Sequence, residues 1–341
     1  MNKKRVLVAL SGGVDSAAAA LLLRDSGMEV IAATLRLENE TAAAAAEEVA
    51  SALKIPHRVI PAETEFMERV LRPSALEYAC GRTPNPCCFC NPLVKFALLM
   101  KAAETAGCGY LATGHYAVID ENGAVFRGTD RRKDQSYFLY RLPETFRRRL
   151  LFPLGKLTKP EVRQIAEEAA LPVAGKPESQ DTCFGVAGEK CGETLFRKCR
   201  MTAEPGFFRY NGKIAGRHQG IHLYTIGQRG GTGVALGVPA YIRAINPRNR
   251  EIELVTEPEL LETAEFGISQ TVWHEAPEKV ESRSVTVQIR YRNRGTAGKV
   301  KITAPDKARV TLETAARAVT PGQSAVFYDG DRLLGGGVID G

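Results

Sequence analysis

Close to the N-terminus, an apolar run ends in a glycine turn and leads directly into helix-forming residues. Residues 6–10 read Val-Leu-Val-Ala-Leu, which is typical of a buried strand. Residues 11–16 read Ser-Gly-Gly-Val-Asp-Ser, and the alanines and leucines of residues 17–23 favour a helix. A strand, turn and helix in this order aim backbone N–H groups and the positive helix end at one point. The pattern therefore predicts an anion site at the end of an early strand.

The glycine spacing of the 11–16 loop separates it from two common phosphate loops. A Walker A loop needs Gly-x-x-x-x-Gly-Lys-Ser/Thr, and a dinucleotide fingerprint needs three spaced glycines. The loop instead resembles the pyrophosphate loop of the ATP pyrophosphatases, which split ATP into AMP and pyrophosphate while adenylating a substrate. Gly12 and Gly13 allow the backbone to approach a ligand closely. Asp15 suits either the binding of a metal or the fixing of the loop.

Predicted strands and helices alternate along the first part of the chain and then give way to short strands. The alternation predicts an α/β domain with a doubly wound parallel sheet, whose ligands bind at the carboxyl ends of the strands. Evenly spaced short strands after residue 206 predict a small β-barrel or sandwich. We expect an α/β catalytic domain at 1–200, a small middle domain at 201–262 and a C-terminal β-barrel at 263–341.

The composition narrows the class of protein. Lysine and arginine number 46 against 39 acidic residues, and this net charge of +7 suits a nucleic-acid partner. No apolar run reaches the length of a membrane-spanning helix, and the N-terminus leads straight into a strand without a signal peptide. We therefore expect a cytoplasmic protein with no membrane partner. Eight cysteines in such a protein indicate metal binding or thiol chemistry rather than a disulfide framework.

Two segments hold the cysteines that are candidates for metal binding or thiol chemistry. Residues 83–91 read Thr-Pro-Asn-Pro-Cys-Cys-Phe-Cys-Asn, and the prolines predict an extended loop before a helix that starts near Val94. A thiol just before a helix has a lowered pKa. Residues 179–184 read Ser-Gln-Asp-Thr-Cys-Phe and follow Gly-Lys-Pro, which predicts a second exposed loop. The other cysteines are interpreted as incidental.

Six motifs, in order along the chain, resemble the tRNA-specific 2-thiouridylases (the MnmA or TrmU family). The resemblance extends from Val6 to about Ile339. It implies that ATP adenylates the 2-carbonyl oxygen of the wobble uridine in the tRNA anticodon, and that sulfur then replaces this oxygen. The motifs are residues 11–16, 85–96, 112–116, 133–139, 179–184 and 320–323.

The resemblance also implies a role for each cysteine and for the loop. Cys183 would carry sulfur as a persulfide received from a sulfur-relay protein, and Cys90 would be the partner nucleophile. Cys90 either frees sulfide from the persulfide or forms a disulfide bond with Cys183 after delivery, and both routes stay open. Mg²⁺ would neutralise charge on ATP. The implied ATP contacts are Ala9, Leu10, Ser11, Gly12, Gly13, Val14, Asp15, Ser16, Leu35 and Gly114.

The same resemblance implies a tRNA-binding surface. A base in a folded anticodon loop has to be splayed out before chemistry reaches it, which suits aromatic and arginine side chains. The target base is expected at Asn85, Pro86 and Cys87, with His115 beside it. The further implied contacts are Lys133, Asp134, Gln135, Arg290, Tyr291 and Gln323, and the barrel at 263–341 is expected to bind tRNA.

Three alternatives remain open. Cys87, Cys90 and Cys183 offer three ligands for an iron–sulfur cluster that would deliver sulfide in place of a persulfide. The chain is alternatively an ATP pyrophosphatase that adenylates a small molecule, but such a reaction needs neither the paired cysteines nor a β-rich half. A noncatalytic RNA-binding protein with a relic loop is disfavoured by the intact loop and both cysteines.

Overall fold

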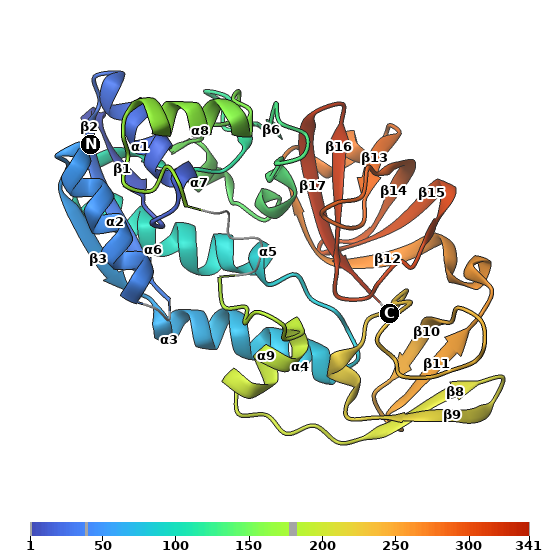
Figure 1. Cartoon of the computed structure of the whole chain (residues 1–341). Coiled ribbons are helices and arrows are strands. Elements are labelled where there is room, and N and C mark those ends of the chain that lie inside the picture. The colour runs from blue at the N-terminus through green and yellow to red at the C-terminus, as the bar shows by residue number, and fades with distance from the viewer. Residues whose placement is uncertain (1, 38–39, 177–182, 341) are drawn as a thin grey trace. The chain divides into compact units, whose positions relative to one another are not determined.

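The computed structural model describes residues 2–37, 40–176 and 183–340 (Figure 1). The chain divides into two compact units. The first unit comprises Met1–Phe66, Cys87–Gln180 and Asp331–Leu333. The second unit comprises Met67–Pro86, Asp181–Gly330 and Leu334–Gly341.

The first unit is built on a parallel sheet of five strands in the order β3-β2-β1-β4-β7. Val6 lies opposite Val30 on one side and Tyr110 on the other, so β1 is central. Because the strand order reverses between β1 and β4, their carboxyl ends form the crevice where such sheets bind ligands. The strands are β1 (Asn2–Ala9), β2 (Glu29–Arg36), β3 (His57–Pro61), β4 (Cys108–Ala112) and β7 (Leu150–Leu151).

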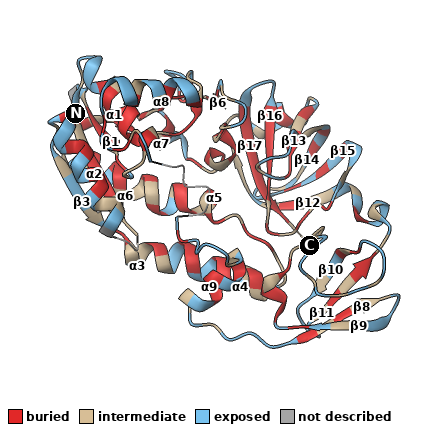
Figure 2. Cartoon of the chain, viewed as in Figure 1, coloured by how far each residue is buried: buried red, intermediate tan, exposed pale blue. Residues whose placement is uncertain are grey.

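Helices cover both faces of this sheet, which confirms the predicted doubly wound α/β fold. Val6 and Val8 pack in one cluster with residues of α1 (Val14–Asp25), α2 (Glu40–Leu53) and α8 (Lys159–Glu168). Side chains alternate along a strand, so the buried Leu7 points to the opposite face. There α6 (Phe96–Thr105) packs against β1, β2 and β4. In Figure 2 the buried residues accordingly lie along the strands and the facing sides of these helices.

The cysteines at 87–90 lie on a helix, which corrects the prediction of an extended loop up to Val94. Helix α5 (Pro86–Cys90) continues through the π-helical segment η2 (Asn91–Lys95) into α6. Proline is compatible with the first turn of a helix because its missing N–H has no partner there. The helix therefore begins at Pro86, and the loop before it without regular secondary structure covers residues 82–85.

Shorter elements complete the first unit. Strands β5 and β6 form an antiparallel pair, and Arg332 pairs with Phe126 of β6. Asn122 and Ala124, between the two strands, donate their N–H groups to Asp120. The elements are α3 (Glu63–Phe66), β5 (Ala117–Ile119), β6 (Val125–Arg127), the 3₁₀ segment η3 (Ser136–Leu139) and α7 (Glu144–Arg147).

Two β-structures make up most of the second unit. A four-stranded sheet has the order β10-β11-β8-β9, with Phe208 and Ile242 in its core. The second structure is a closed barrel, because β12 pairs with both β15 and β17. Val287, Val310 and Phe327 fill its interior. The strands are β8 (Gly206–Tyr210), β9 (Lys213–His218), β10 (Tyr241–Asn246), β11 (Glu251–Val255), β12 (Glu262–Trp273), β13 (Val285–Gln288), β14 (Thr296–Ala304), β15 (Lys307–Arg317), β16 (Ser324–Asp329) and β17 (Arg332–Ile339).

The predicted small middle domain and β-barrel are both present, and the exact boundaries at 200 and 262 stay predictions. The remaining elements are η1 (Met67–Leu71), α4 (Arg72–Ala79), α9 (Cys191–Lys198), η4 (Ile221–Leu223), η5 (Pro258–Leu261) and α10 (Pro277–Glu281). Among the described residues, none of the helices combines the length and apolarity that a membrane crossing requires.

Candidate active site

The 11–16 loop joins β1 to α1 and is closed by the hydroxyl of Ser16. This hydroxyl donates to the Gly13 carbonyl at 3.0 Å and accepts from the Ser11 N–H, also at 3.0 Å. Gly12 has a φ of +72°, and a Cβ there would lie 2.8 Å from the Ala42 carbonyl of α2. The loop therefore needs glycine at this position both for its backbone conformation and for its packing.

The second predicted segment of the site, residues 112–116, lies directly against this loop. A Cβ on Gly114 would lie 2.9 Å from both the Asp15 carbonyl carbon and the Ser16 nitrogen. Only a glycine lets the end of β4 approach the first turn of α1 so closely. The structure thus brings together the carboxyl ends of β1 and β4, as the alternating pattern predicted. Ala9 and Leu10 lead into the loop, and Leu35 lies at the end of the neighbouring strand β2.

Two cationic or polar side chains hold the carboxylate of Asp15. The Tyr116 hydroxyl donates to Asp15 Oδ1 at 2.7 Å, and Lys159 Nζ donates to the same oxygen at 2.6 Å. The Lys159 side chain is only 10% exposed, so its charge needs this partner. Sequence reasoning missed both residues: the capping box of Thr158 and Glu161 marks the start of α8, but this pattern does not indicate a contact between Lys159 and Asp15.

The site offers one carboxylate for a divalent cation. Mg²⁺ in nucleotide sites keeps several waters and binds through one or two carboxylates together with the phosphates. Asp15, at the loop, fits this donor set. Across residues 2–37, 40–176 and 183–340, no three His, Cys, Asp or Glu side chains gather as a metal site. A cation at the loop would therefore take most of its ligands other than water from the phosphates.

The two predicted reactive cysteines have different surroundings. Cys90, in the first unit, is buried at the end of α5, and the next residue, Asn91, donates to the Phe138 carbonyl at 3.0 Å. Cys183, in the second unit, is exposed, as predicted, and the preceding residues of its motif, 179–182, lie outside the described residues. Cys87 is half-buried. The roles of all three stay predictions.

Burial disfavours the thiolate form of three of the remaining cysteines. Burial raises the pKa of Cys108, Cys191 and Cys199. Because the thiolate is the nucleophile and the metal ligand, a raised pKa supports the interpretation of these three as incidental.

His115 is a packed, neutral histidine. Its ring stacks on Phe96 at a centroid distance of 5.7 Å and meets Phe152 edge-on at 5.8 Å. Its Nδ1 lies 2.6 Å from the Thr113 hydroxyl. Burial, aided by the nearby Lys95 charge, lowers the pKa of His115 well below its usual value. The His115 imidazole is buried in this structure, and its contact with the target base stays a prediction.

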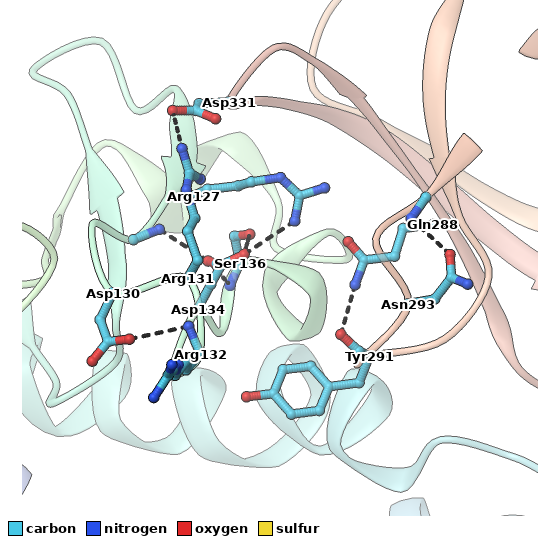
Figure 3. Close-up of polar contacts among 12 residues, drawn as sticks. Arg127, Asp130, Arg131, Arg132, Asp134, Ser136, Gln288, Tyr291, Asn293 and Asp331 are labelled. Carbon is cyan, nitrogen blue, oxygen red and sulfur yellow. Dashed lines mark hydrogen bonds and ion pairs between the residues drawn. The ribbon is translucent and has the colours of Figure 1, made fainter. Parts of the chain in front are cut away.

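The predicted tRNA-binding segment Lys133, Asp134 and Gln135 lies in a tightly bonded loop (Figure 3). Asp134 Oδ1 accepts from the N–H groups of Gly128 at 2.9 Å and Ser136 at 3.1 Å. Its Oδ2 accepts from the Ser136 hydroxyl and from Arg127. The Asp134 carboxylate therefore shapes the loop, while Lys133 is half-buried beside it.

In the second unit, the predicted tRNA contacts Arg290 and Tyr291 are hydrogen-bonded to neighbouring parts of the chain. The buried Gln288 donates to the carbonyls of Arg290 at 3.0 Å and Tyr291 at 2.7 Å, and the latter bond is drawn in Figure 3. The Arg290 guanidinium donates to the Ala318 carbonyl.

Gln323 acts on the segment that precedes the cysteine helix. Its amide donates to the Thr83 carbonyl at 2.8 Å and to the Pro84 carbonyl at 3.3 Å. The Thr83 N–H in turn donates to the Pro321 carbonyl at 2.8 Å. The turn at 320–323 thus holds the chain just before Asn85, which is half-buried, and Pro86, which is buried. Whether these residues contact tRNA stays a prediction.

Three family models match the sequence. They are a tRNA methyl transferase HUP domain at residues 4–186, a tRNA methyl transferase PRC-barrel domain at 196–256 and an aminomethyltransferase beta-barrel domain at 263–339. The tRNA-specific 2-thiouridylase MnmA of Carboxydothermus hydrogenoformans is 40% identical over 363 residues, covering 100% of this chain and 98% of that protein. The MnmA of Desulforudis audaxviator is 42% identical over 340 residues, with 98% of each chain covered. The MnmA of Thermus thermophilus is 42% identical over 359 residues, covering 98% of this chain and 95% of its own.

Proposed function

Because this chain belongs to the family of tRNA-specific 2-thiouridylases MnmA, we propose that it replaces the 2-oxygen of the wobble uridine of tRNA by sulfur, at the expense of ATP. The observation that carries this proposal is the 11–16 loop at the carboxyl end of β1, in a chain that matches such enzymes over nearly its whole length. The family-model names mention methyl transfer, whereas these full-length relatives are named thiouridylases. The 11–16 loop, which resembles that of the ATP pyrophosphatases, and the cysteines Cys90 and Cys183 in their motifs support ATP-dependent sulfur transfer.

The first half of the proposed reaction activates the oxygen. The uridine 2-oxygen attacks the α-phosphorus of ATP, the bond to the β-phosphate oxygen breaks, and pyrophosphate leaves. The N–H groups of the 11–16 loop and the start of α1 stabilise the departing negative charge. Mg²⁺, when bound, supplies further charge neutralisation on the phosphates. Leu35 and Gly114 are proposed to lie against the adenosine.

The second half transfers the sulfur. The terminal sulfur of a persulfide on Cys183 attacks C2 of the adenylated uridine, and AMP leaves with the original oxygen. The Cys90 thiolate then displaces the new thiocarbonyl sulfur from Cys183, which leaves a Cys90–Cys183 disulfide for a dithiol to reduce. In the other route, the Cys90 thiolate first attacks the Cys183 sulfur of the persulfide, which forms the Cys90–Cys183 disulfide and frees sulfide. The sulfide then attacks C2, and AMP leaves with the original oxygen.

The proposed partners follow from this chemistry. The exposure of Cys183 suits loading by a sulfur-relay protein. We propose that the chain works in the cytoplasm, where tRNA is found. We also propose that the β-barrel in the domain at 263–341 contributes to tRNA binding.

An iron–sulfur cluster on Cys87, Cys90 and Cys183 remains the alternative sulfur source. This alternative predicts iron and sulfide in protein purified without oxygen.

The test is a reconstituted reaction containing the purified chain, unmodified tRNA, ATP, Mg²⁺ and a persulfide donor. We expect 2-thiouridine in the tRNA by mass spectrometry and one AMP and one pyrophosphate for each sulfur inserted. The matched control is the same tRNA with cytidine at the wobble position, which should stay unmodified. Pyrophosphate release that depends on an added small-molecule acceptor and not on tRNA, without 2-thiouridine, would instead indicate adenylation of a small molecule.

A further inference from the structure

The Asp15 carboxylate is held by two residues whose own positions depend on a third segment of the first unit. Tyr116 and Lys159 both donate to Asp15 Oδ1, at 2.7 and 2.6 Å. They come from different elements, the turn after β4 and the start of α8. Two donors that converge on one oxygen fix its place and offset its negative charge, which matters beside a site for phosphates.

The first of these donors is held by Gln135. The Tyr116 N–H donates to Gln135 Oε1 at 3.0 Å, and the Gln135 N–H donates to the Tyr116 carbonyl at 2.8 Å. These two reciprocal bonds fix the backbone of Tyr116 and thereby the direction of its side chain. Gly128 adds close packing, since a Cβ there would lie 2.8 Å from the Tyr116 carbonyl oxygen.

The second donor is held by Asp130, five residues before Gln135. Asp130 Oδ2 accepts the N–H of Lys159 at 3.0 Å, which fixes the first residue of α8. Asp130 Oδ1 accepts the N–H of Arg132 at 3.0 Å, a bond drawn in Figure 3. The loop at 128–136 therefore reaches Asp15 by two separate routes, Gln135 to Tyr116 and Asp130 to Lys159.

We propose that Tyr116 and Lys159 are positioning residues for the Asp15 carboxylate, and that the 128–136 loop sets both of them and so controls how tightly the 11–16 loop binds ATP. This inference rests on the proposed function, which makes ATP the ligand of the 11–16 loop. It gives Gln135, expected from family resemblance to contact tRNA, a second task that operates without tRNA.

The test measures binding of Mg²⁺ and a nonhydrolysable ATP analogue by calorimetry, in the full chain without tRNA or sulfur donor. Tyr116→Phe should weaken binding about tenfold, because it removes one hydrogen bond to a charged group and keeps the ring. Tyr110→Phe, the same change on neighbouring β4, is the control and should bind as wild type does. Lys159→Gln should weaken binding by more than tenfold, since it also removes the charge that offsets Asp15.

Gln135 gives the decisive variants. Gln135→Ala should weaken analogue binding about threefold to tenfold, while Gln135→Glu, which keeps an acceptor for the Tyr116 N–H, should restore most of it. The double variant Tyr116→Phe/Gln135→Ala should lose little more than Tyr116→Phe alone, because Gln135 acts through Tyr116. Melting temperatures, measured in parallel, separate this effect from a loss of folded protein.

Two results would overturn the inference: wild-type affinity in folded Gln135→Ala, or losses that add fully in the double variant. Wild-type protein that binds the analogue but makes no 2-thiouridine overturns only the proposed function. Wild-type protein that binds no analogue overturns both.

Discussion

The 11–16 loop and the Cys183 turn are two contrasting parts of the proposed machinery. In the loop, Ser16 bonds to Ser11 and Gly13, and the Asp15 carboxylate has donors from Tyr116 and Lys159. Cys183 instead lies exposed in a turn. A site shaped by many bonds loses activity gradually when one bond is removed. A site that depends on one sulfur atom loses all activity when that atom is removed.

The largest expected effect concerns the cysteines. Cys183→Ala and Cys90→Ala should each abolish 2-thiouridine formation, because no other atom takes the place of the missing sulfur. Both should still release pyrophosphate with tRNA present, since the 11–16 loop is unaltered. Mass spectrometry of tRNA from a deletion strain that carries each variant measures the first quantity. Cys80→Ala, an exposed cysteine outside the motifs, is the control, and normal thiolation by Cys183→Ala would contradict its assignment.

Asp15→Ala should produce the next largest effect. We expect tRNA-dependent pyrophosphate release to fall about a hundredfold, because the two bonds that Asp15 accepts from Tyr116 and Lys159 disappear. Lys159 would lose its ion pair with Asp15, which is itself 37% exposed, so we expect the free energy of unfolding to fall by only about 1–2 kcal/mol. In the double variant Asp15→Ala/Lys159→Met, stability should recover while pyrophosphate release stays low. A double variant that regains release would show that Asp15 is not needed.

Gly114→Ala tests how closely the parts of the loop region are packed. Its Cβ would lie 2.9 Å from the Ser16 nitrogen, so we expect a loss of about 1–3 kcal/mol in unfolding free energy and several-fold weaker ATP binding. Gly175→Ala is the matched control, because a Cβ there meets nothing within 4 Å. Chemical denaturation and calorimetry give the two quantities. Equal behaviour of the two variants would mean that the packing at Gly114 is looser than described.

The smallest expected effect is a pH dependence of stability from His115. The folded chain keeps this imidazole neutral, since burial lowers its pKa, whereas the unfolded chain protonates it near pH 6.5. The unfolded state then binds more protons below that pH, so the free energy of unfolding falls as the pH falls, by about 1.4 kcal/mol per pH unit for one proton. His57, His218 and His222 have pKa values lowered by burial as well and add to the same slope. Denaturation of His115→Gln between pH 5 and 7 should therefore show a shallower slope, and an unchanged slope would exclude His115 as a contributor.

The fold followed from local patterns to a large extent. Apolar runs and glycine turns predicted the parallel sheet, and evenly spaced short strands after residue 206 predicted the barrel. The predicted start of the cysteine helix near Val94 was wrong, because two prolines are compatible both with an extended loop and with the first turn of a helix.

The partners within the site could not be predicted in the same way. Tyr116 and Lys159 lie 101 and 144 residues from Asp15 in sequence, and nothing in the local spacing of either indicates the contact. Asp134 shows the complementary difficulty. A polar residue in a motif suggests a ligand contact, yet its carboxylate bonds to Gly128, Ser136 and Arg127. Only the arrangement in space distinguishes a side chain that binds a ligand from one that shapes a loop.

The bond from Gln323 to the Thr83 carbonyl has a consequence for the order in which a newly made chain matures. The two residues are 240 positions apart, and the helix with Cys87 and Cys90 begins three residues after Thr83. At translation rates of about 5–20 residues per second, Thr83 waits roughly 10–50 seconds before Gln323 has been synthesised. During that interval the entry to the cysteine helix lacks its final support. A nascent chain on the ribosome, surrounded by tRNA, thus acquires the start of this helix in its finished form only near the end of synthesis.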